Sequence, residues 1–215
     1  MNFKAVSVRE EGIRNILMTY NNRVQIETVL DPTMLYCAKT WDEMEIDPNS
    51  VNKKYAFVYL IHHSNQTKKN IYNYCKNNDL SMVLVAHAQG WYKKADEAYY
   101  DIQVIEFGPR EWIGYIKRAE VIFTDSFHGT IYSILYQKQF WSFEKMDKNI
   151  SNEMLLVLRK YNLLKKLSLL DRCVDYSYIP SNLNDDIEID YTKVNSLLEI
   201  ERDRSITFLR NALDL

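Results

Sequence analysis

The sequence predicts an α/β protein whose mostly parallel, doubly wound sheet of Rossmann type carries helices on both faces. Two observations lead to this fold class. Apolar, β-prone runs alternate along the chain with segments of helical periodicity. Some runs, such as Tyr55–Ile61 and Met82–Ala86, are apolar throughout, as in strands that a parallel sheet buries on both faces. An antiparallel α+β fold fits such runs poorly.

The first elements of the chain are two strands around a helix. Phe3–Val8 and Val24–Val29 are rich in β-prone residues, and Glu10–Tyr20 between them has apolar residues at helical spacing. Asp31-Pro32 stops the second strand, and Thr40–Met44 is expected to form a short helix.

The centre of the chain continues the alternation. Strands are expected at Tyr55–Ile61, Met82–Ala86, Ile102–Ile105, Val121–Thr124 and Phe140–Phe143. Helices are expected at Gln66–Asn78, after Gly108-Pro109, and at Phe127–Tyr136. Proline suits the first position of a helix, because the N–H that it lacks would have no partner there. Cys75 lies on the apolar side of its helix and is expected in the core.

The C-terminal part is predicted to be mostly helical. Ser151–Tyr161 has a helical pattern, Ser177–Asp190 is a polar, acidic loop, and Asp190 can cap a last helix. No internal repeat or linker is visible. We therefore expect one Rossmann-like domain over residues 1–190, with residues 191–215 forming a helix that packs on it.

Composition excludes several classes of protein. The chain has 215 residues, of which 47% are hydrophobic, so it can bury a core. The net charge of −2 argues against nonspecific binding to nucleic acid. Three widely spaced cysteines without a C-x-x-C pair argue against disulfides and structural zinc and favour the cytoplasm. No signal peptide is visible, and the longest apolar run is too short for a transmembrane segment.

The densest cluster of polar residues follows the Val121 strand, at Thr124–Thr130. In doubly wound sheets, ligands bind at the carboxyl ends of the strands. The N-terminus of the following helix favours an anion, and Ser126 and Thr130 add hydroxyl groups. His128 can transfer a proton near neutral pH, and Gly129 allows a ligand to approach the backbone.

Other polar residues also follow predicted strands. Ser7 and Arg9 end the first strand, which we expect to lie close to the Val121 strand in the sheet, so that Arg9 and Ser126 converge on one anion. The remaining polar residues at strand ends are His62, His63, Ser64, His87 and Gln89. Adjacent histidines diverge on a strand, and nothing completes a ligand set around His87, so we expect no metal site.

A structural interpretation stands beside the functional one. Ser126 or Asp125 can simply cap the helix, His128 can be a hydrogen-bonded structural residue, and Arg9 can form a salt bridge. The sequence has no G-x-S-x-G, P-loop or G-x-G-x-x-G motif. The sequence therefore lacks the motifs that usually indicate a serine hydrolase, a nucleoside triphosphatase or a dinucleotide oxidoreductase.

The cluster belongs to a longer pattern. Its parts are Gly108-Pro109, Trp112, Ala119, the T-D-S-F-H-G of Thr124–Gly129, Ser133, Phe140, the S-V-R-E of Ser7–Glu10, the L-D-P-T of Leu30–Thr33, and Asp190-Tyr191, Glu201-Arg202, Ser205 and Leu209 near the end. In this pattern the chain resembles the polysaccharide pyruvyl transferase family over nearly its whole length.

The resemblance implies a transferase with a GT-B-like architecture of two Rossmann-like domains. Characterised members move pyruvate from phosphoenolpyruvate to a sugar of a cell-surface polysaccharide, as a ketal. The expected partners are therefore phosphoenolpyruvate and a sugar or lipid-linked oligosaccharide acceptor, without a metal or organic cofactor. We expect His128 and Arg9 to be catalytic, and substrate to be bound by Ser126, Gly129, Thr130, Ser7 and Asp125.

The chain departs from the family pattern in two ways. It starts directly at the S-V-R-E strand, without the Gly-rich N-x-G-x-x-L-Q stretch of the family's first domain, so we expect only the C-terminal, donor-side portion. Glu153 stands near the place where relatives have an arginine, and it would repel an anionic donor. Two other functions therefore stay open: a GT-B glycosyltransferase half-domain that binds a nucleotide sugar, and a noncatalytic anion-binding module.

Overall fold

The computed structural model describes residues 3–20, 23–48, 51–62, 65–85, 99–104, 107–145, 158–178 and 188–215. The chain divides into two compact units. Unit 1 comprises Met1–Tyr36, Met146–Cys173 and Asp190–Leu215, and unit 2 comprises Cys37–Lys145 and Val174–Ile189. The N-terminal segment groups with the C-terminal helix in unit 1, and the expected domain division at residue 190 stays a prediction.

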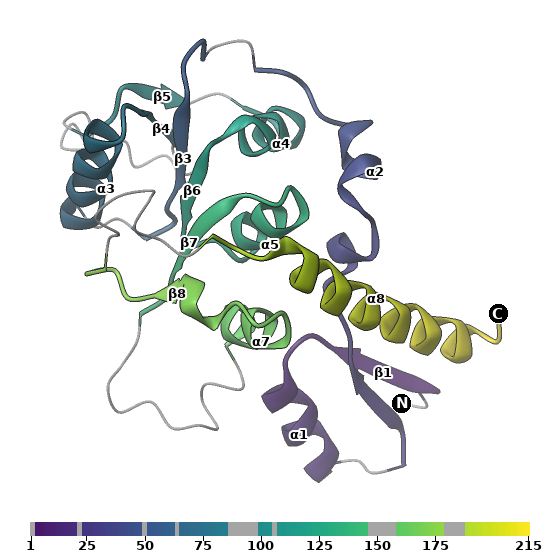
Figure 1. Ribbon diagram of the computed structural model, residues 1–215. Helices are drawn as coiled ribbons and strands as arrows, with labels where there is room; N and C mark the ends of the chain where they lie inside the picture. The colour runs from purple at the N-terminus through teal and green to yellow at the C-terminus, as the bar shows by residue number, and fades with distance from the viewer. Residues whose placement is uncertain are drawn as a thin grey trace. The chain divides into compact units, whose positions relative to one another are not determined.

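Unit 2 contains the parallel sheet that the sequence predicts (Figure 1). Its strands are β3 (Tyr55–Tyr59), β4 (Ser81–Val85), β5 (Ile102–Val104), β6 (Val121–Thr124) and β7 (Gln139–Phe143). They lie in the order β5-β4-β3-β6-β7, and every neighbouring pair is parallel. A strand missed from the sequence, β8 (Cys173–Val174), follows β7, where the Glu144 N–H donates to the Val174 carbonyl at 2.9 Å.

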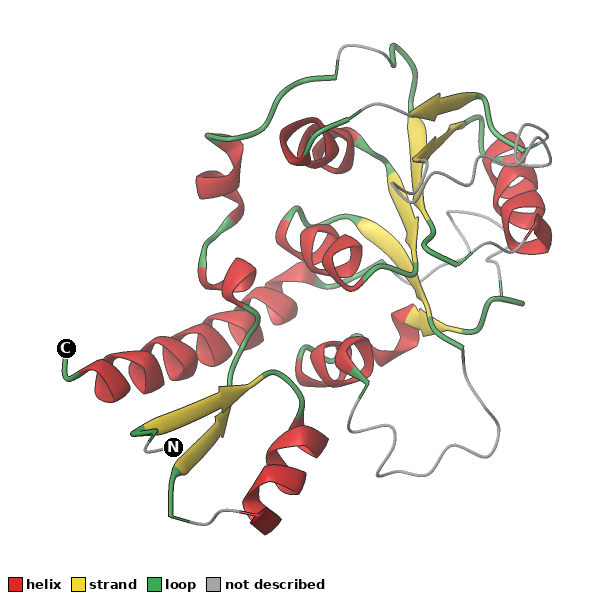
Figure 2. Cartoon of the chain, turned by 180° about the vertical axis from the view of Figure 1, so that it is seen from behind, coloured by secondary structure: helices red, strands yellow, loops and turns green. Residues whose placement is uncertain are grey.

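Helices cover both faces of this sheet, as expected for a doubly wound fold (Figure 2). The helix α3 (Asn65–Asn77) lies on one face, while α4 (Pro109–Arg118) and α5 (Phe127–Leu135) lie on the other (Figure 1). The short helix α2 (Ala38–Asp42) precedes the sheet in the chain. From β3 the chain adds β4 and β5 on one side of the sheet, and then returns to add β6 and β7 on the other side of β3. The strand order therefore reverses between β3 and β6. This is the topological switch point of the sheet.

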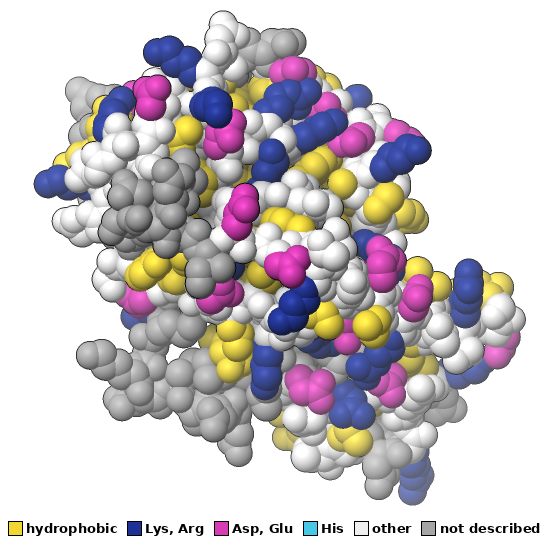
Figure 3. Space-filling view, viewed as in Figure 1, with side chains coloured by type: hydrophobic (Ala, Val, Ile, Leu, Met, Phe, Trp, Pro, Cys, Tyr) yellow, Lys and Arg dark blue, Asp and Glu magenta, His cyan; other side chains and the backbone are white. Residues whose placement is uncertain are grey.

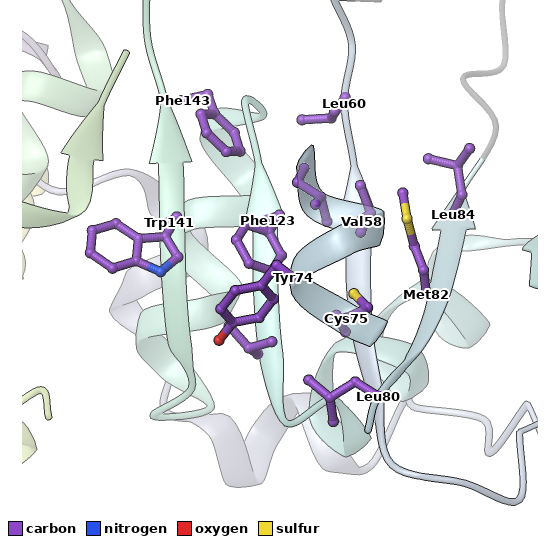
Figure 4. Packing of buried hydrophobic residues seen from close by; sticks show 13 residues of the cluster. Val58, Leu60, Tyr74, Cys75, Leu80, Met82, Leu84, Phe123, Trp141 and Phe143 are labelled. Atoms are coloured by element: carbon purple, nitrogen blue, oxygen red, sulfur yellow. The ribbon is translucent and has the colours of Figure 1, made fainter. Parts of the chain in front are cut away.

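The core of unit 2 is built on both faces of the strands. On the α3 face, Tyr74 and Cys75 point at β3, β4 and β6 (Figure 4). Burial raises the pKa of the Cys75 thiol to about 12, so this cysteine is an inert core residue, as predicted. On the opposite face, Phe57 packs edge-on against Trp112, with ring centroids 6.2 Å apart. The runs of apolar residues are therefore buried on both faces of the sheet, as expected for parallel strands.

Unit 1 has a sheet of its own. The strands β1 (Ala5–Val8) and β2 (Gln25–Thr28) pair in parallel, with α1 (Glu11–Tyr20) between them in the chain. The strands and helix were predicted, but the expectation that the first strand lies near Val121 in one sheet is wrong. In the described residues, β1 pairs with β2 in a separate two-stranded sheet.

The helix α8 (Tyr191–Leu213) is tied to the N-terminal segment of unit 1. Asp190 caps it as predicted, by accepting the N–H groups of Thr192 and Lys193 at 3.0 and 3.2 Å. Buried Arg202 donates to the Met34 carbonyl at 2.9 Å. The Leu30 N–H donates to Ser205 Oγ at 3.0 Å. Two parts of the family pattern, at the start and the end of the chain, thus meet in one unit.

The other elements of unit 1 are short. They are η1 (Pro32–Leu35), α7 (Arg159–Lys166) and η3 (Leu170–Arg172). Of the helix expected at Ser151–Tyr161, residues 151–157 lie outside the described residues, and Arg159–Tyr161 form the start of α7. Both η segments were missed, because single 3₁₀ turns lack a periodic pattern long enough to read.

Charged side chains of both signs are interspersed on the face shown in Figure 3, in keeping with the small net charge. Within the described ranges, no helix combines the length and apolar character needed to cross a membrane. The three cysteines are free thiols: Cys75 is buried, Cys37 is exposed and Cys173 is partly exposed.

Candidate functional site

The predicted cluster lies at the topological switch point of unit 2. Tyr59, the last residue of β3, pairs with Thr124, the last residue of β6. The Thr124 hydroxyl donates to the Tyr59 carbonyl at 2.7 Å and accepts the Ser126 N–H at 3.1 Å. The loop before α5 is thereby fixed to both strands. In open α/β sheets this position, at the carboxyl ends of the strands where their order reverses, is where ligands bind.

Ser126 and Thr130 are buried and engaged in the loop. Ser126 is the N-cap of α5, and its hydroxyl accepts the Gly129 N–H at 3.2 Å. The Thr130 hydroxyl donates to the Ser126 carbonyl at 3.0 Å and lies 2.8 Å from Ser142 Oγ. These bonds establish the structural role of both hydroxyl groups. Direct binding of substrate by them stays a prediction.

Gly129 is required by the packing of α5 on its own strand. A Cβ at this position would lie 2.4 Å from Thr124 Oγ1 and 3.0 Å from Thr124 Cγ2. Real Cβ atoms do not approach other heavy atoms so closely. The structure thus supplies a reason for glycine other than the approach of a ligand, and that approach stays a prediction.

His128 extends from the first turn of α5 into solvent. It is exposed, while Ser126, Gly129 and Thr130 around it are buried. Its ring contacts Phe127 edge-on, with centroids 5.5 Å apart. Exposure at the positive end of a helix leaves the imidazole within reach of an anionic ligand.

Asp125 does not face solvent but holds the neighbouring loop. It accepts the N–H groups of Ile61 and His62 at 2.6 and 2.7 Å, and the Tyr176 hydroxyl at 2.9 Å. Its Oδ2 also lies 3.1 Å from His62 Nδ1. These contacts lock the chain that leaves β3 to the chain that leaves β6. They assign Asp125 a positioning role, and contact with substrate stays a prediction.

Tyr176 was missed by the sequence prediction. Burial raises the pKa of its hydroxyl, and the adjacent Asp125 carboxylate raises it further. The phenol therefore stays protonated and donates to Asp125 throughout the physiological range. The same two causes, in the same order, raise the pKa of Tyr59. Both shifts reflect first the burial of the phenols and then the nearby carboxylate at the end of the sheet.

Arg9 and Ser7 belong to unit 1. Arg9 Nη1 lies 2.5 Å from Asp31 Oδ2, and the side chain of Asp31 is buried. The same carboxylate caps η1 through the Thr33 N–H and hydroxyl, at 3.0 and 2.7 Å. Two motifs that the sequence presented separately, S-V-R-E and L-D-P-T, are thus joined by an ion pair. Ser7 is exposed on β1, opposite Glu27.

The predicted site residues therefore fall into two groups. Asp125, Ser126, His128, Gly129 and Thr130 share one loop and helix start in unit 2, and Ser7 and Arg9 share one segment of unit 1. Convergence of Arg9 and Ser126 on one anion stays a prediction.

Some candidate site residues from the sequence cannot be placed in the structure. His63, Ser64, His87, Gln89 and Glu153 lie outside the described residues. Among the residues that are described, no group of three or more His, Cys, Asp or Glu side chains is arranged to hold a metal ion.

Comparison with known sequences gives one match to a family. The sequence model of the family described as polysaccharide pyruvyl transferase matches residues 1–144. The matched region contains the S-V-R-E, L-D-P-T and T-D-S-F-H-G motifs. No curated protein matches the chain.

Comparison with solved structures identifies similar folds. The UDP-GlcNAc 2-epimerase of Methanocaldococcus jannaschii, in complex with UDP-GlcNAc and UDP, is similar with a TM-score of 0.55 and 14% identity, covering 93% of this chain and 54% of that one. The Neisseria meningitidis UDP-GlcNAc 2-epimerase bound to UDP-GlcNAc has a TM-score of 0.53 and 11% identity, covering 94% and 55%. The likeness confirms the GT-B-like α/β fold, and the chain spans about half the length of these structures.

Proposed function

The chain belongs to the polysaccharide pyruvyl transferase family, and from this membership we propose that it transfers pyruvate from phosphoenolpyruvate to a sugar of a cell-surface polysaccharide, as a ketal. One observation supports the placement of the chemistry more than any other. The exposed His128 stands on the first turn of α5, at the switch point, while its neighbours in the motif are buried. We place the reaction in the cytoplasm.

The proposed reaction defines what the site has to supply. A proton adds to the methylene carbon of phosphoenolpyruvate, two sugar hydroxyls bond to C2, and the bond from C2 to the phosphate oxygen breaks. One hydroxyl proton offsets the proton that becomes part of the methyl group, and the other leaves on phosphate. No net proton is consumed. The site therefore needs an acid, a proton acceptor and positive groups that hold a trianionic donor.

We propose the following groups for these needs. His128 is the proposed acid, since an imidazole transfers protons near neutral pH. The N-terminal turn of α5 presents backbone N–H groups and the positive end of a dipole to one anionic group. Arg9 of unit 1 stays a predicted anion-binding residue, because a guanidinium matches a carboxylate or phosphate in geometry. The scheme assigns no metal or organic cofactor, since the enol phosphate already carries its leaving group.

The acceptor sugar is proposed to bind partly outside this chain. Ligand sites often lie where two domains meet. The solved structures of similar fold are about twice as long as the part that resembles this chain. We therefore assign the donor half of the reaction to the chain, and expect transfer to require a partner domain.

Transfer is tested with the chain joined to a first domain of the family. Phosphate release is measured with phosphoenolpyruvate and methyl hexosides that have free 4- and 6-hydroxyls, and the ketal is identified by mass. We expect His128→Gln to keep the fold, because the side chain is exposed, and to lower transfer by at least ~100-fold. Glu120→Gln is the matched control, since Glu120 is exposed at the opposite end of β6. Unchanged transfer by His128→Gln would contradict the assignment.

A nucleotide-sugar transferase is the second candidate function. Both structures of similar fold were determined with UDP-GlcNAc, which favours this alternative over other classes. Calorimetric titration of the chain with UDP and with phosphoenolpyruvate separates the two. Binding of UDP alone supports the alternative, and binding of phosphoenolpyruvate alone supports the proposed function. Binding of phosphoenolpyruvate without transfer in the joined protein supports a noncatalytic module.

A further inference from the structure

His62 has no assigned role, although its exposed ring lies beside a buried carboxylate. Its side chain is 79% exposed, whereas the side chain of its partner Asp125 is completely buried. Nδ1 of His62 lies 3.1 Å from Asp125 Oδ2. Most exposed histidines move freely and have no fixed partner. Here an exposed ring is attached to a buried carboxylate at the switch point of the sheet.

The carboxylate is held independently of the imidazole. The N–H groups of Ile61 and His62 and the hydroxyl of Tyr176 all donate to Asp125, at 2.6, 2.7 and 2.9 Å. These bonds compensate the cost of burying the charge and fix both of its oxygens. Tyr176 also packs edge-on against the ring of His62, with centroids 6.4 Å apart. The position of the imidazole is therefore determined from two sides.

This arrangement determines which ring nitrogen exchanges protons. A carboxylate only accepts hydrogen bonds, so Nδ1 of His62 must carry a hydrogen toward Asp125. In the neutral ring, Nε2 then holds the lone pair on the opposite side. The same logic orients the histidine of a catalytic triad, where the aspartate fixes the tautomer and stabilises the imidazolium that forms.

We propose that His62 is the general base that takes the proton from the attacking sugar hydroxyl, and that Asp125 is its positioning residue. The inference rests on the proposed function, whose acid, His128, is at the end of the neighbouring strand. His62 follows β3 and His128 follows β6, and these strands are paired up to Tyr59 and Thr124. The two imidazoles thus occupy the same edge of the sheet.

The steps balance as follows. His128 gives a proton to the methylene carbon, the double-bond electrons form the new C–H bond, and the first hydroxyl oxygen bonds to C2 while Nε2 of His62 takes its proton. The C2–O bond to phosphate then breaks with its electron pair on phosphate. The second hydroxyl bonds to C2, and its proton goes to the departing phosphate. Solvent returns the proton from His62 to His128.

The tautomer is the first test, and it needs no substrate. The chain is labelled with ¹⁵N in histidine, and the His62 resonances are identified by their loss in His62→Gln. We expect neutral His62 to carry its hydrogen on Nδ1, and Asp125→Asn to abolish that preference, since an amide cannot act as a pure acceptor. A neutral His62 that carries its hydrogen on Nε2 would overturn the proposal. If Asp125→Asn unfolds the chain, the tautomer of His62 in the unmutated chain still decides whether the proposal stands.

Transfer to methyl hexosides by the chain joined to a first domain is the second test. We expect His62→Ala to lower kcat by about 100-fold and to leave binding of phosphoenolpyruvate unchanged. Added imidazole should restore part of the loss, because the side chain it replaces is exposed. Glu120→Gln serves again as the control.

The outcomes separate this inference from the proposed function. If His128→Gln is inactive and His62→Ala transfers at the original rate, the base assignment is overturned and the proposed function stands. If the unmutated protein releases no phosphate with any hexoside, the proposed function fails and the base assignment fails with it. Loss of transfer in His62→Ala with rescue by imidazole supports both.

Discussion

The close packing of Gly129 on Thr124 allows a quantitative prediction. In Gly129→Ala the new methyl group would lie 2.4 Å from Thr124 Oγ1, so the threonine has to rotate or α5 has to move. Overpacking of this kind costs about 2 kcal/mol. Rotation of Thr124 also breaks its bond to the Tyr59 carbonyl, at about 1 kcal/mol. Replacing a helical glycine returns up to ~1 kcal/mol. We expect a net loss of about 2 kcal/mol in the free energy of unfolding.

A double-mutant cycle isolates the contact. Thr124→Ala removes Oγ1 and Cγ2, the two atoms nearest to the added methyl group, and leaves only the milder contact with Cβ at 3.1 Å. We expect the loss in the free energy of unfolding of the double variant to be smaller than the sum of the two single losses by about 1–2 kcal/mol. Combination of Gly129→Ala with the distant Glu120→Gln should be additive within about 0.5 kcal/mol.

Urea unfolding followed by tryptophan fluorescence provides the measurement. Trp41, Trp112 and Trp141 all belong to unit 2 and report on its unfolding. Additive losses for Gly129→Ala and Thr124→Ala, or a Gly129→Ala variant as stable as the original, would refute the packing argument. The glycine would then be explained by the ligand instead.

Three further predictions concern other parts of the chain. Arg9→Gln should weaken phosphate binding in calorimetric titrations, and binding by the unmutated chain should weaken as salt rises. Asp190→Ala should cost about 1 kcal/mol, seen as earlier loss of helical circular dichroism, because α8 loses its cap. Arg118 donates to Glu45 and lowers the pKa of that carboxyl, so its contribution is complete above the unfolded pKa near ~4.3 and is lost as pH falls. Glu45→Gln should therefore reduce the acid sensitivity of unfolding.

The parts of the fold that local pattern determines could be predicted. The strand Val121–Thr124 was predicted at the residues where the structure has it, and the N-cap is Ser126, one of the two residues, with Asp125, that the sequence offered. A buried strand is apolar at every position and a helix start needs a side-chain acceptor, and both signals lie within a few residues. Helix is expected up to Tyr161, whereas α7 continues to Lys166, because the end of a helix depends on packing that local sequence does not show.

The pairing of distant segments could not be predicted. Phe3–Val8 reads equally well as a strand of the central sheet and as a partner of β2, since alternation reveals a strand and not its neighbour. Tyr176 bonds to Asp125 across 51 positions of sequence. Nothing near either residue indicates the other. The buried, hydrogen-bonded environment of Asp125 arises only when the chain has folded.

The composition of unit 1 affects how the chain is made. Its N-terminal segment depends on α8, because the Leu30 N–H is satisfied by Ser205, 175 positions later. At a translation rate of roughly 5–20 residues per second, Leu30 is synthesised about 9–35 s before its partner. The stretch Cys37–Lys145 of unit 2 is continuous, so its sheet can assemble during that interval. Strands β1 and β2 can pair earlier, but the Leu30 N–H meets its partner only after α8 has been synthesised.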